Sequence, residues 1–215
     1  MLNVHSIFGP TIQGEGTVTG VPSIFVRFSG CNMWSGEEKT RANSMCPFCD
    51  TDFLEGEQME VDGIIETIQG LSGYKDGWYM VVLTGGEPLL QPHNDLKNLI
   101  NILNALNYQT QIETNGSINS PLLKYIDIVT CSPKLPLEDC KINWGYVHNL
   151  KLLYPHPNPE IRPEQFNILD IVEKHLQPID GPDYKENVKA TIDKVYELGI
   201  AWKISLQTHK FMEVE

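Results

Sequence analysis

Strand-like and helix-like hydrophobic patterns alternate along this chain, and no other feature limits its possible folds so strongly. Strand-like patterns cover residues 2–8, 23–29, 78–84, 109–114, 126–131, 149–153, 174–177 and 202–206. Helical patterns cover residues 62–71, with Asp62 as the expected N-cap, 95–106 and 184–198. Strands that alternate with helices favour an α/β fold with a mostly parallel sheet and right-handed crossovers. Such sheets bind ligands at the carboxyl ends of their strands.

The length and charge of the chain argue against several classes of protein. At 215 residues it is close to the size of one domain, and we expect residues 1–215 to form a single domain. The 16 Lys and Arg against 28 Asp and Glu give a formal net charge of −12, which argues against nucleic-acid binding. No apolar run reaches the roughly 18–20 residues of a membrane span, and residues 1–16 lack the pattern of a signal peptide. We therefore expect a cytoplasmic protein without a membrane partner, whose thiols are reduced.

Polar motifs follow several of the predicted strands, where a parallel sheet would place its ligand site. They are Gly30-Cys31, Thr84-Gly85-Gly86-Glu87-Pro88, Glu113-Thr114-Asn115-Gly116, Ser132-Pro133-Lys134 and Gln207-Thr208-His209-Lys210. Two long loops rich in glycine and polar residues cover residues 10–20 and 30–53. Long loops in compact domains are usually functional or disordered, and the cysteines and aromatic residues of the second loop favour a function.

Three of the five cysteines fall within 19 consecutive residues, with the spacing C-x14-C-x2-C. Thiolates suit both zinc and iron–sulfur clusters. A structural zinc site needs four ligands, so Cys140 or a histidine would have to complete it. Three thiolates on a cubane cluster instead leave one iron open for a ligand. From spacing alone, Cys31, Cys46 and Cys49 are either unrelated thiols, part of a zinc site, or ligands of an open iron–sulfur cluster.

The order of the motifs along the chain resembles the radical S-adenosylmethionine enzymes, and among them the 7-carboxy-7-deazaguanine synthase family. The matching segments are residues 13–16, 27–36, 46–53, 84–88, 113–116, 132–134, 177–182 and 207–210. The long cysteine spacing resembles one branch of that family. The resemblance implies a partial, trimmed TIM-type barrel with a radical S-adenosylmethionine core and an extended cluster-binding loop at residues 30–53. The length agrees, because a full eight-unit barrel typically takes about 250 residues.

The resemblance also implies the cofactors and the residues that hold them. One [4Fe–4S] cluster would be ligated by Cys31, Cys46 and Cys49, and S-adenosylmethionine would bind its open iron. The implied contacts to S-adenosylmethionine are Phe48, Asp50, Gly86, Glu87, Ser132, Pro133, Lys134, Gln177, Pro178, Ile179 and Asp180. Mg²⁺ is implied as well, bound through the hydroxyl group of Thr51, in keeping with its preference for few protein ligands. No residue is expected to carry the radical, since the cofactor does.

The substrate that the resemblance implies is 6-carboxy-5,6,7,8-tetrahydropterin. Arg27 would pair with its carboxylate, and Glu15 would receive the guanidine-like N–H edge of the pterin. The further implied substrate contacts are Ile12, Gln13, Gly14, Thr84, His209 and Glu215. The product would be 7-carboxy-7-deazaguanine, formed by radical ring contraction with loss of ammonia, in queuosine- or archaeosine-type biosynthesis.

Two alternative functions remain open at this point. A glycyl-radical activase would keep the cluster but would act on a partner protein. A zinc-stabilised binding module would use the same cysteines without catalysis. For the synthase, the expected partners are a flavodoxin-like or ferredoxin-like reductant and a second copy of the chain in a homodimer.

Overall fold

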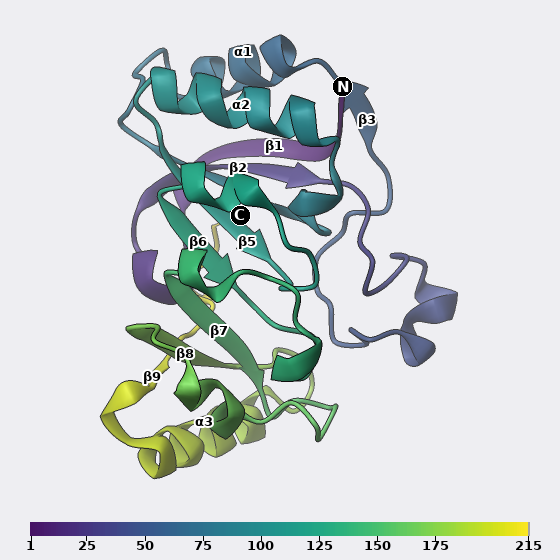
Figure 1. Ribbon diagram of the computed structural model, residues 1–215, viewed down its shortest axis with the longest axis vertical. Helices are drawn as coiled ribbons and strands as arrows, with labels where there is room; N and C mark the ends of the chain where they lie inside the picture. The colour runs from purple at the N-terminus through teal and green to yellow at the C-terminus, as the bar shows by residue number, and fades with distance from the viewer. Residues whose placement is uncertain (215) are drawn as a thin grey trace.

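The computed structural model describes residues 1–214, and Figure 1 traces their path through one sheet and its flanking helices. The strands are β1 (Leu2–Ile12), β2 (Pro22–Phe28), β3 (Glu57–Met59), β4 (Met80–Gly85), β5 (Gln109–Thr114), β6 (Ile128–Cys131), β7 (Asn149–Tyr154), β8 (Glu173–Pro178) and β9 (Lys203–Ile204). The α-helices are α1 (Val61–Leu71), α2 (His93–Ala105), α3 (Tyr184–Leu198) and α4 (Thr208–Met212). Short 3-10 helices lie in the connections, among them η2 (Glu38–Asn43) and η3 (Pro88–Leu90).

The sheet is mostly parallel and does not close into a barrel. Its strand order is β3-β1-β2-β4-β5-β6-β7-β8-β9, so that β3 and β9 form its two edges. Strand β1 pairs antiparallel with both β2 and β3. From β2 to β9 every neighbouring pair is parallel. The predicted α/β partial barrel is therefore confirmed.

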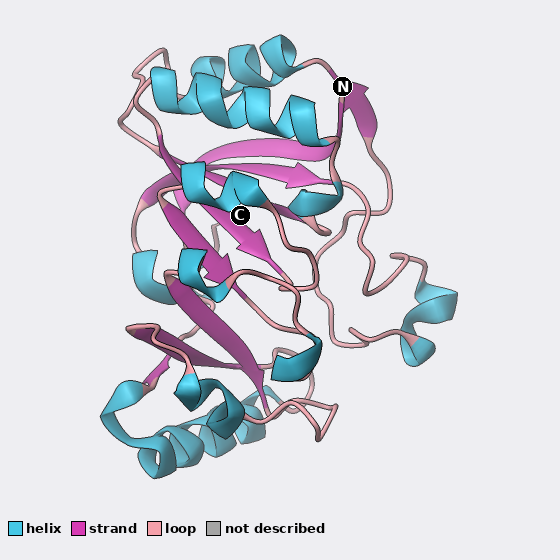
Figure 2. Cartoon of the chain, in the orientation of Figure 1, coloured by secondary structure: helices cyan, strands magenta, loops and turns pink. Residues whose placement is uncertain are grey.

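The helices cover the outer face of the sheet, as the cyan and magenta layers of Figure 2 show. Helices α1 and α2 pack against each other over the β1–β5 half, and α3 packs on β7 and β8. Strand β2 turns Ile24, Val26 and Phe28 toward this layer, and all three side chains are completely buried. Burying each such side chain contributes about 1.5–3 kcal/mol to the free energy of unfolding. Its alternate residues face the interior of the partial barrel, as the alternating sequence predicted.

The inner face of the sheet carries polar side chains that bond to one another from strand to strand. Gln13 donates to Gln111 at 2.9 Å, and Gln111 donates to the Thr130 hydroxyl at 2.9 Å. The side-chain amide of Asn149 donates to the same hydroxyl at 3.2 Å, and the side-chain oxygen of Asn149 lies 2.9 Å from His175 Nδ1. A buried polar group needs such partners, because leaving it unpaired costs about 1–3 kcal/mol. Hydrogen bonds therefore hold the polar side chains inside this partial barrel in fixed positions below the strand ends.

Some local predictions differ from the structure. The N-cap of α1 is Glu60, and Asp62 instead lies in the first helical turn. Strand β3, which has three residues, exists through its pairing with β1 and has no hydrophobic pattern of its own. The strand expected at residues 202–206 shortens to the two residues of β9, and α4 follows it. No helix in residues 1–214 is both long enough and apolar enough to cross a membrane.

Candidate active site

A cavity of about 330 Å³ opens at the carboxyl ends of the parallel strands, beside the loop of residues 30–53, here called the cysteine loop. It brings together most of the predicted site residues: Ile12, Gln13, Glu15, Arg27, Cys31, Cys46, Phe48, Cys49, Asp50, Thr51, Thr84, Gly86, Ser132, Lys134, Gln177, Pro178, Ile179, Asp180 and His209. Gly14, Glu87 and Pro133 lie outside its lining, and Glu215 lies outside the described residues. The predicted residues thus meet in one place from nearly every strand.

Three cysteine thiols line one end of this cavity. Cys31, Cys46 and Cys49 are all free, and none forms a disulfide. Burial raises the pKa of Cys46 to about 12, and burial likewise raises the pKa of Cys49. Within residues 1–214, no group of three or more His, Cys, Asp or Glu side chains is already gathered closely enough to hold a metal ion. The fit to an iron–sulfur cluster therefore rests on the chemistry of the donors, three thiols facing one cavity.

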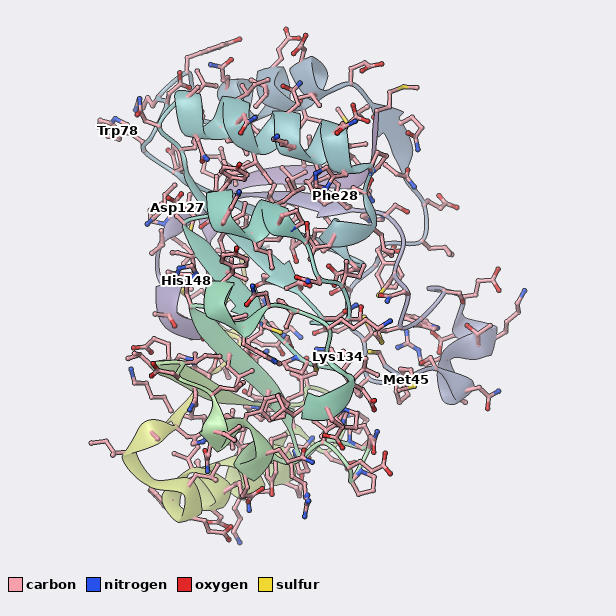
Figure 3. All side chains as sticks on the ribbon, viewed as in Figure 1. Phe28, Met45, Trp78, Asp127, Lys134 and His148 are labelled. Carbon is pink, nitrogen blue, oxygen red and sulfur yellow. The ribbon has the colours of Figure 1, made fainter. Side chains whose placement is uncertain are left out.

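The cysteine loop is held in place by an arginine and two aromatic rings. Arg41, in η2, donates to the carbonyl oxygens of Pro47 at 3.2 Å and Cys49 at 2.8 Å. Its guanidinium group lies 4.1 Å from the ring centre of Trp34, which in turn packs edge-on against Phe53 at 5.7 Å. Figure 3 shows the loop, marked by Met45, projecting from the side of the molecule where Lys134 lies. The two cysteines of the C-x2-C pair thus have a fixed backbone.

The glycine turn after β4 packs directly against the start of the cysteine loop. The Gly86 amide donates to the Phe28 carbonyl at 3.0 Å, and the Glu87 amide donates to the Gly30 carbonyl at 2.9 Å. A side chain at Gly86 would lie 1.9 Å from that Gly30 oxygen, so only glycine fits. The turn therefore fixes the position of the chain that carries Cys31.

The Glu87 carboxylate is completely buried and tied to neighbouring backbone. It accepts hydrogen bonds from the amides of Asn115 at 2.7 Å and Leu89 at 3.1 Å, and from the Thr114 hydroxyl at 2.9 Å. Burial raises the pKa of Glu87 despite these donors. This carboxylate joins the turn after β4 to the turn after β5. Its predicted contact with S-adenosylmethionine stays a prediction.

A half-buried lysine and an aromatic pair lie beside the thiols. Lys134 donates to the carbonyl oxygen and the hydroxyl group of Ser132, at 2.8 and 2.6 Å. Burial lowers the pKa of Lys134, although the nearby Cys46 thiol opposes that shift. Phe48 packs edge-on against His156 at 5.4 Å, and the buried Nε2 atom of His156 has no partner within residues 1–214. Lys134, which lines the cavity here, therefore places a positive charge that suits an anionic ligand.

The cavity also holds a network of two carboxylates and one ammonium group. Lys151 hydrogen-bonds to Glu15 Oε2, and its Nζ atom lies 3.6 Å from Glu113 Oε1. Gln207 donates to Glu15 Oε1 at 2.8 Å. Burial acts to raise the pKa of Glu15, but the Lys151 ammonium outweighs it and holds that pKa below its usual value. Glu15 is therefore an ionised acceptor inside the cavity, suited to paired N–H donors.

Arg27 enters the cavity from β2 with an unused hydrogen-bond donor. Its guanidinium group lies 5.0 Å from the ring centre of Phe8, and Phe8 stacks on Phe25 at 5.1 Å. The Nε atom is buried and has no partner within residues 1–214. A buried donor without a partner is uncommon, and it marks a place where a ligand can bind. A carboxylate is the ligand that a guanidinium group pairs with best.

The C-terminal segment closes one side of the cavity. Lys210 of α4 pairs with Asp50 at 2.8 Å and with Asp180 at 2.6 Å, linking the cysteine loop to the loop after β8. His209 packs closely against Gly14. A Cβ atom added to Gly14 would lie 2.0 Å from the Nδ1 atom of His209. The Gly14 carbonyl also accepts a hydrogen bond from the Thr208 amide at 2.9 Å. Gly14, although outside the lining, positions His209 within it.

Several lining residues were given no individual role from the sequence, although Gly85, Glu113, Thr114, Asn115, Gln207 and Lys210 belong to the motifs expected at the strand ends. They are Phe8, Phe25, Met33, Trp34, Phe53, Gly85, Glu113, Thr114, Asn115, Lys151, Leu153, Gln207 and Lys210. The sequence did carry a signal for Lys151, which is the one charged residue in the strand-like segment 149–153. A charge in a buried strand needs a partner, so it could have been assigned to the site.

Comparison with curated proteins identifies the family. The chain is 39% identical over 212 residues to the 7-carboxy-7-deazaguanine synthase of Burkholderia multivorans, covering 95% of each chain. It is 38% identical over 210 residues to the synthase of Caulobacter vibrioides, covering 94% of each. The chain belongs to the 7-carboxy-7-deazaguanine synthase family. A scan of protein-family models finds no match.

Solved structures agree with this family in fold. QueE from Escherichia coli superposes with a TM-score of 0.66 at 24% identity, covering 95% of this chain and 93% of that one. SuiB from Streptococcus suis superposes with a TM-score of 0.52 at 14% identity, covering 83% of this chain and 47% of that one. At these identities the likeness shows the fold alone, which is the open, mostly parallel α/β sheet described above.

Proposed function

We propose that this chain is a radical S-adenosylmethionine lyase, which converts 6-carboxy-5,6,7,8-tetrahydropterin to 7-carboxy-7-deazaguanine and ammonia in 7-deazapurine biosynthesis. The observation that carries the proposal is one cavity that joins three thiols to an unpartnered arginine and an ionised glutamate. The 38–39% identity to synthases, which extends over nearly the whole chain, supports the same activity. It favours neither the glycyl-radical activase nor the zinc-stabilised binding module.

The thiol end of the cavity would hold the cofactors. Cys31, Cys46 and Cys49 would ligate one [4Fe–4S] cluster, with S-adenosylmethionine beside it. When bound, these groups supply the one-electron chemistry that starts hydrogen abstraction from the substrate. Apart from Glu87 and Pro133, the cofactor contacts proposed above line the cavity, and the Lys134 ammonium group, which has no ion-pair partner within residues 1–214, suits the carboxylate of S-adenosylmethionine. The chain's own task at this end is to bind, orient and shield.

The other end would hold the pterin. Arg27 would pair with the substrate carboxylate through its free donor, and Glu15 would receive the N–H edge of the ring. Thr51 would bind Mg²⁺, which would also offset the carboxylate charge. The remaining proposed substrate contacts are Ile12, Gln13, Gly14, Thr84, His209 and Glu215. Fixing the pterin at two edges would align its reacting carbon with the thiol end.

The partners belong to the same proposal. We propose a single domain over residues 1–215, a homodimer, a flavodoxin-like or ferredoxin-like reductant, and a cytoplasmic location without nucleic-acid or membrane binding. The formal net charge of −12 supports the exclusion of nucleic acid.

An anaerobic assay tests the activity. Protein reconstituted with iron and sulfide is incubated with dithionite, S-adenosylmethionine, Mg²⁺ and the tetrahydropterin, and the product is followed by mass spectrometry. Formation of 7-carboxy-7-deazaguanine, lost in Cys46→Ala, supports the proposal. A reconstituted brown protein that forms no deazaguanine would refute it. Zinc in a colourless protein would support the binding module instead.

A further inference from the structure

We infer that Lys151 is a positioning residue for substrate binding, whose ammonium group lies between the carboxylates of Glu15 and Glu113 and holds them in place for the pterin. The inference rests on the proposed function and deepens it, because it names the group that builds the recognition end of the cavity. Lys151 belongs to none of the sets of cluster, cofactor or substrate contacts proposed above.

Lys151 lies in the middle of β7, where only 7% of its side chain is exposed. It hydrogen-bonds to one oxygen of Glu15, which comes from the loop after β1, and lies 3.6 Å from an oxygen of Glu113 on β5. The ammonium group therefore lies between two carboxylates from separate parts of the sheet. A buried cation in this position is stable only with such partners.

Glu113 and Glu15 are also hydrogen-bonded to proposed substrate contacts. Glu113 Oε2 accepts a hydrogen bond from the Thr84 hydroxyl at 3.1 Å, and Glu113 Oε1 lies 3.5 Å from Gln13 Nε2. The Glu15 amide donates to Gln13 Oε1 at 3.1 Å. Thr84 and Gln13 thus contact the Glu113 carboxylate that Lys151 faces, and Gln13 also contacts the backbone of Glu15, whose carboxylate Lys151 holds. Moving that ammonium group would disturb all three at once.

Charge explains why a cation is needed at this position. Burial and the negative charge of Asp50 both act to raise the pKa of Glu15, and the Lys151 ammonium reverses the result. The same ammonium group faces Glu113, while Lys134 and His175 are the other basic groups near it. Without the cation, the Glu15 carboxylate would keep the burial that raises its pKa, would lie near the partly exposed Glu113 carboxylate, and would lose the positive charge that lowers its pKa. A protonated Glu15 presents a donor where the pterin also presents donors.

Lys151→Met therefore weakens substrate binding in a pH-dependent way. At pH near 7 we expect KM for the tetrahydropterin to rise about tenfold or more, while kcat changes less. Because a raised carboxyl pKa leaves Glu15 protonated at lower pH, KM of the variant falls as the pH is raised. The wild-type KM stays flat over the same range, because its Glu15 is already ionised.

The experiment compares three variants with the wild type in the reconstituted enzyme. Lys151→Met removes the charge, and Lys151→Arg keeps it. Lys174→Met is the matched control, since Lys174 is also a buried strand lysine but donates to the Leu169 carbonyl at 2.7 Å, away from the cavity. KM and kcat are measured from about pH 6 to 9. Equilibrium binding of the tetrahydropterin is measured by calorimetry without reductant, so that no turnover occurs.

The inference is supported if Lys151→Met loses substrate binding in a pH-dependent way while Lys151→Arg and Lys174→Met bind the substrate like the wild type. If Lys151→Met does not fold, a wild-type-like, pH-independent KM in Lys151→Arg supports it, and a KM raised equally at every pH overturns it. A folded Lys151→Met with unchanged binding, or with loss that does not vary with pH, also overturns it. A wild type that binds no pterin and forms no product instead refutes the proposed function, and the inference with it.

Discussion

Replacing Gly86 with alanine tests the close packing between the cysteine loop and the turn after β4. The new Cβ atom would lie 1.9 Å from the Gly30 oxygen and 2.4 Å from its carbonyl carbon. Real Cβ contacts do not fall below 3.0 Å, so the two segments must separate by about 1.1 Å. Both are backbone, so rotating a side chain cannot relieve the clash.

The cost follows from the contacts that this separation weakens. Overpacking alone costs about 1–3 kcal/mol. The hydrogen bonds from Gly86 to Phe28 and from Glu87 to Gly30, at 3.0 and 2.9 Å, add about 1 kcal/mol each. We therefore expect Gly86→Ala to lower the free energy of unfolding by about 3–5 kcal/mol. For a chain of this size that corresponds to a Tm lower by about 6–20 °C.

Urea and thermal unfolding of the reduced, cluster-free protein measure this loss. Gly63→Ala is the matched control, because Gly63 lies inside α1 and a Cβ atom added there would meet nothing within 4 Å. That substitution should stabilise the protein by about 0.5–1 kcal/mol through helix propensity. If Gly86→Ala unfolds within about 0.5 kcal/mol of the wild type while the control behaves as expected, the packing argument is wrong.

Two further predictions concern buried polar groups near the cavity. Glu87→Gln places an NH₂ group against backbone amides that now donate to the carboxylate. Urea unfolding should therefore show a free energy of unfolding lower by about 1–3 kcal/mol. An unchanged urea midpoint would contradict the hydrogen-bond assignment. Burial and the Lys134 ammonium lower the pKa of His156 to about 4, from 6.5. The folded state therefore binds this proton more weakly than the unfolded chain, and stability falls as the pH drops from about 6.5 to 4. In His156→Gln the free energy of unfolding should fall by about 1–3 kcal/mol less over this pH range than in the wild type. Identical pH profiles of stability for the wild type and the variant would refute the lowered pKa of His156.

Much of the fold follows from local pattern, and the exceptions have local causes. Strand β2 was predicted because its residues alternate, and Ile24 and Phe28 are indeed completely buried. Strand β3 was not predicted, because its three residues become a strand only by pairing with β1. The N-cap of α1 is Glu60, although Asp62 is the better capping residue by type, because the chain enters the helix from β3 one residue earlier than predicted.

Site residues that belong to a sequence motif could be predicted from the sequence. Residues that reach the site only because the fold brings them there were missed. The thiols and the glycine turn carry recognisable spacings, so they were predicted from the sequence. Glu15 was predicted too, but its partner Lys151 lies 136 positions away and belongs to no motif. The pairing arises only when β7 and the loop after β1 meet across the sheet, which no local pattern encodes.

The charge of the cavity resolves the difficulty that an acidic protein poses for an anionic substrate. The chain carries a formal net charge of −12, yet the charged side chains that line the cavity balance: Arg27, Lys134, Lys151 and Lys210 against Glu15, Asp50, Glu113 and Asp180. Within residues 1–214, Lys151 and Lys210 pair with all four of these carboxylates, whereas Arg27 and Lys134 form no ion pair. These two cations therefore remain without an ion-pair partner inside the cavity, where the proposed substrate and cofactor each bring a carboxylate. Because they face a cavity and not open solvent, salt screens them less than it screens the acidic surface.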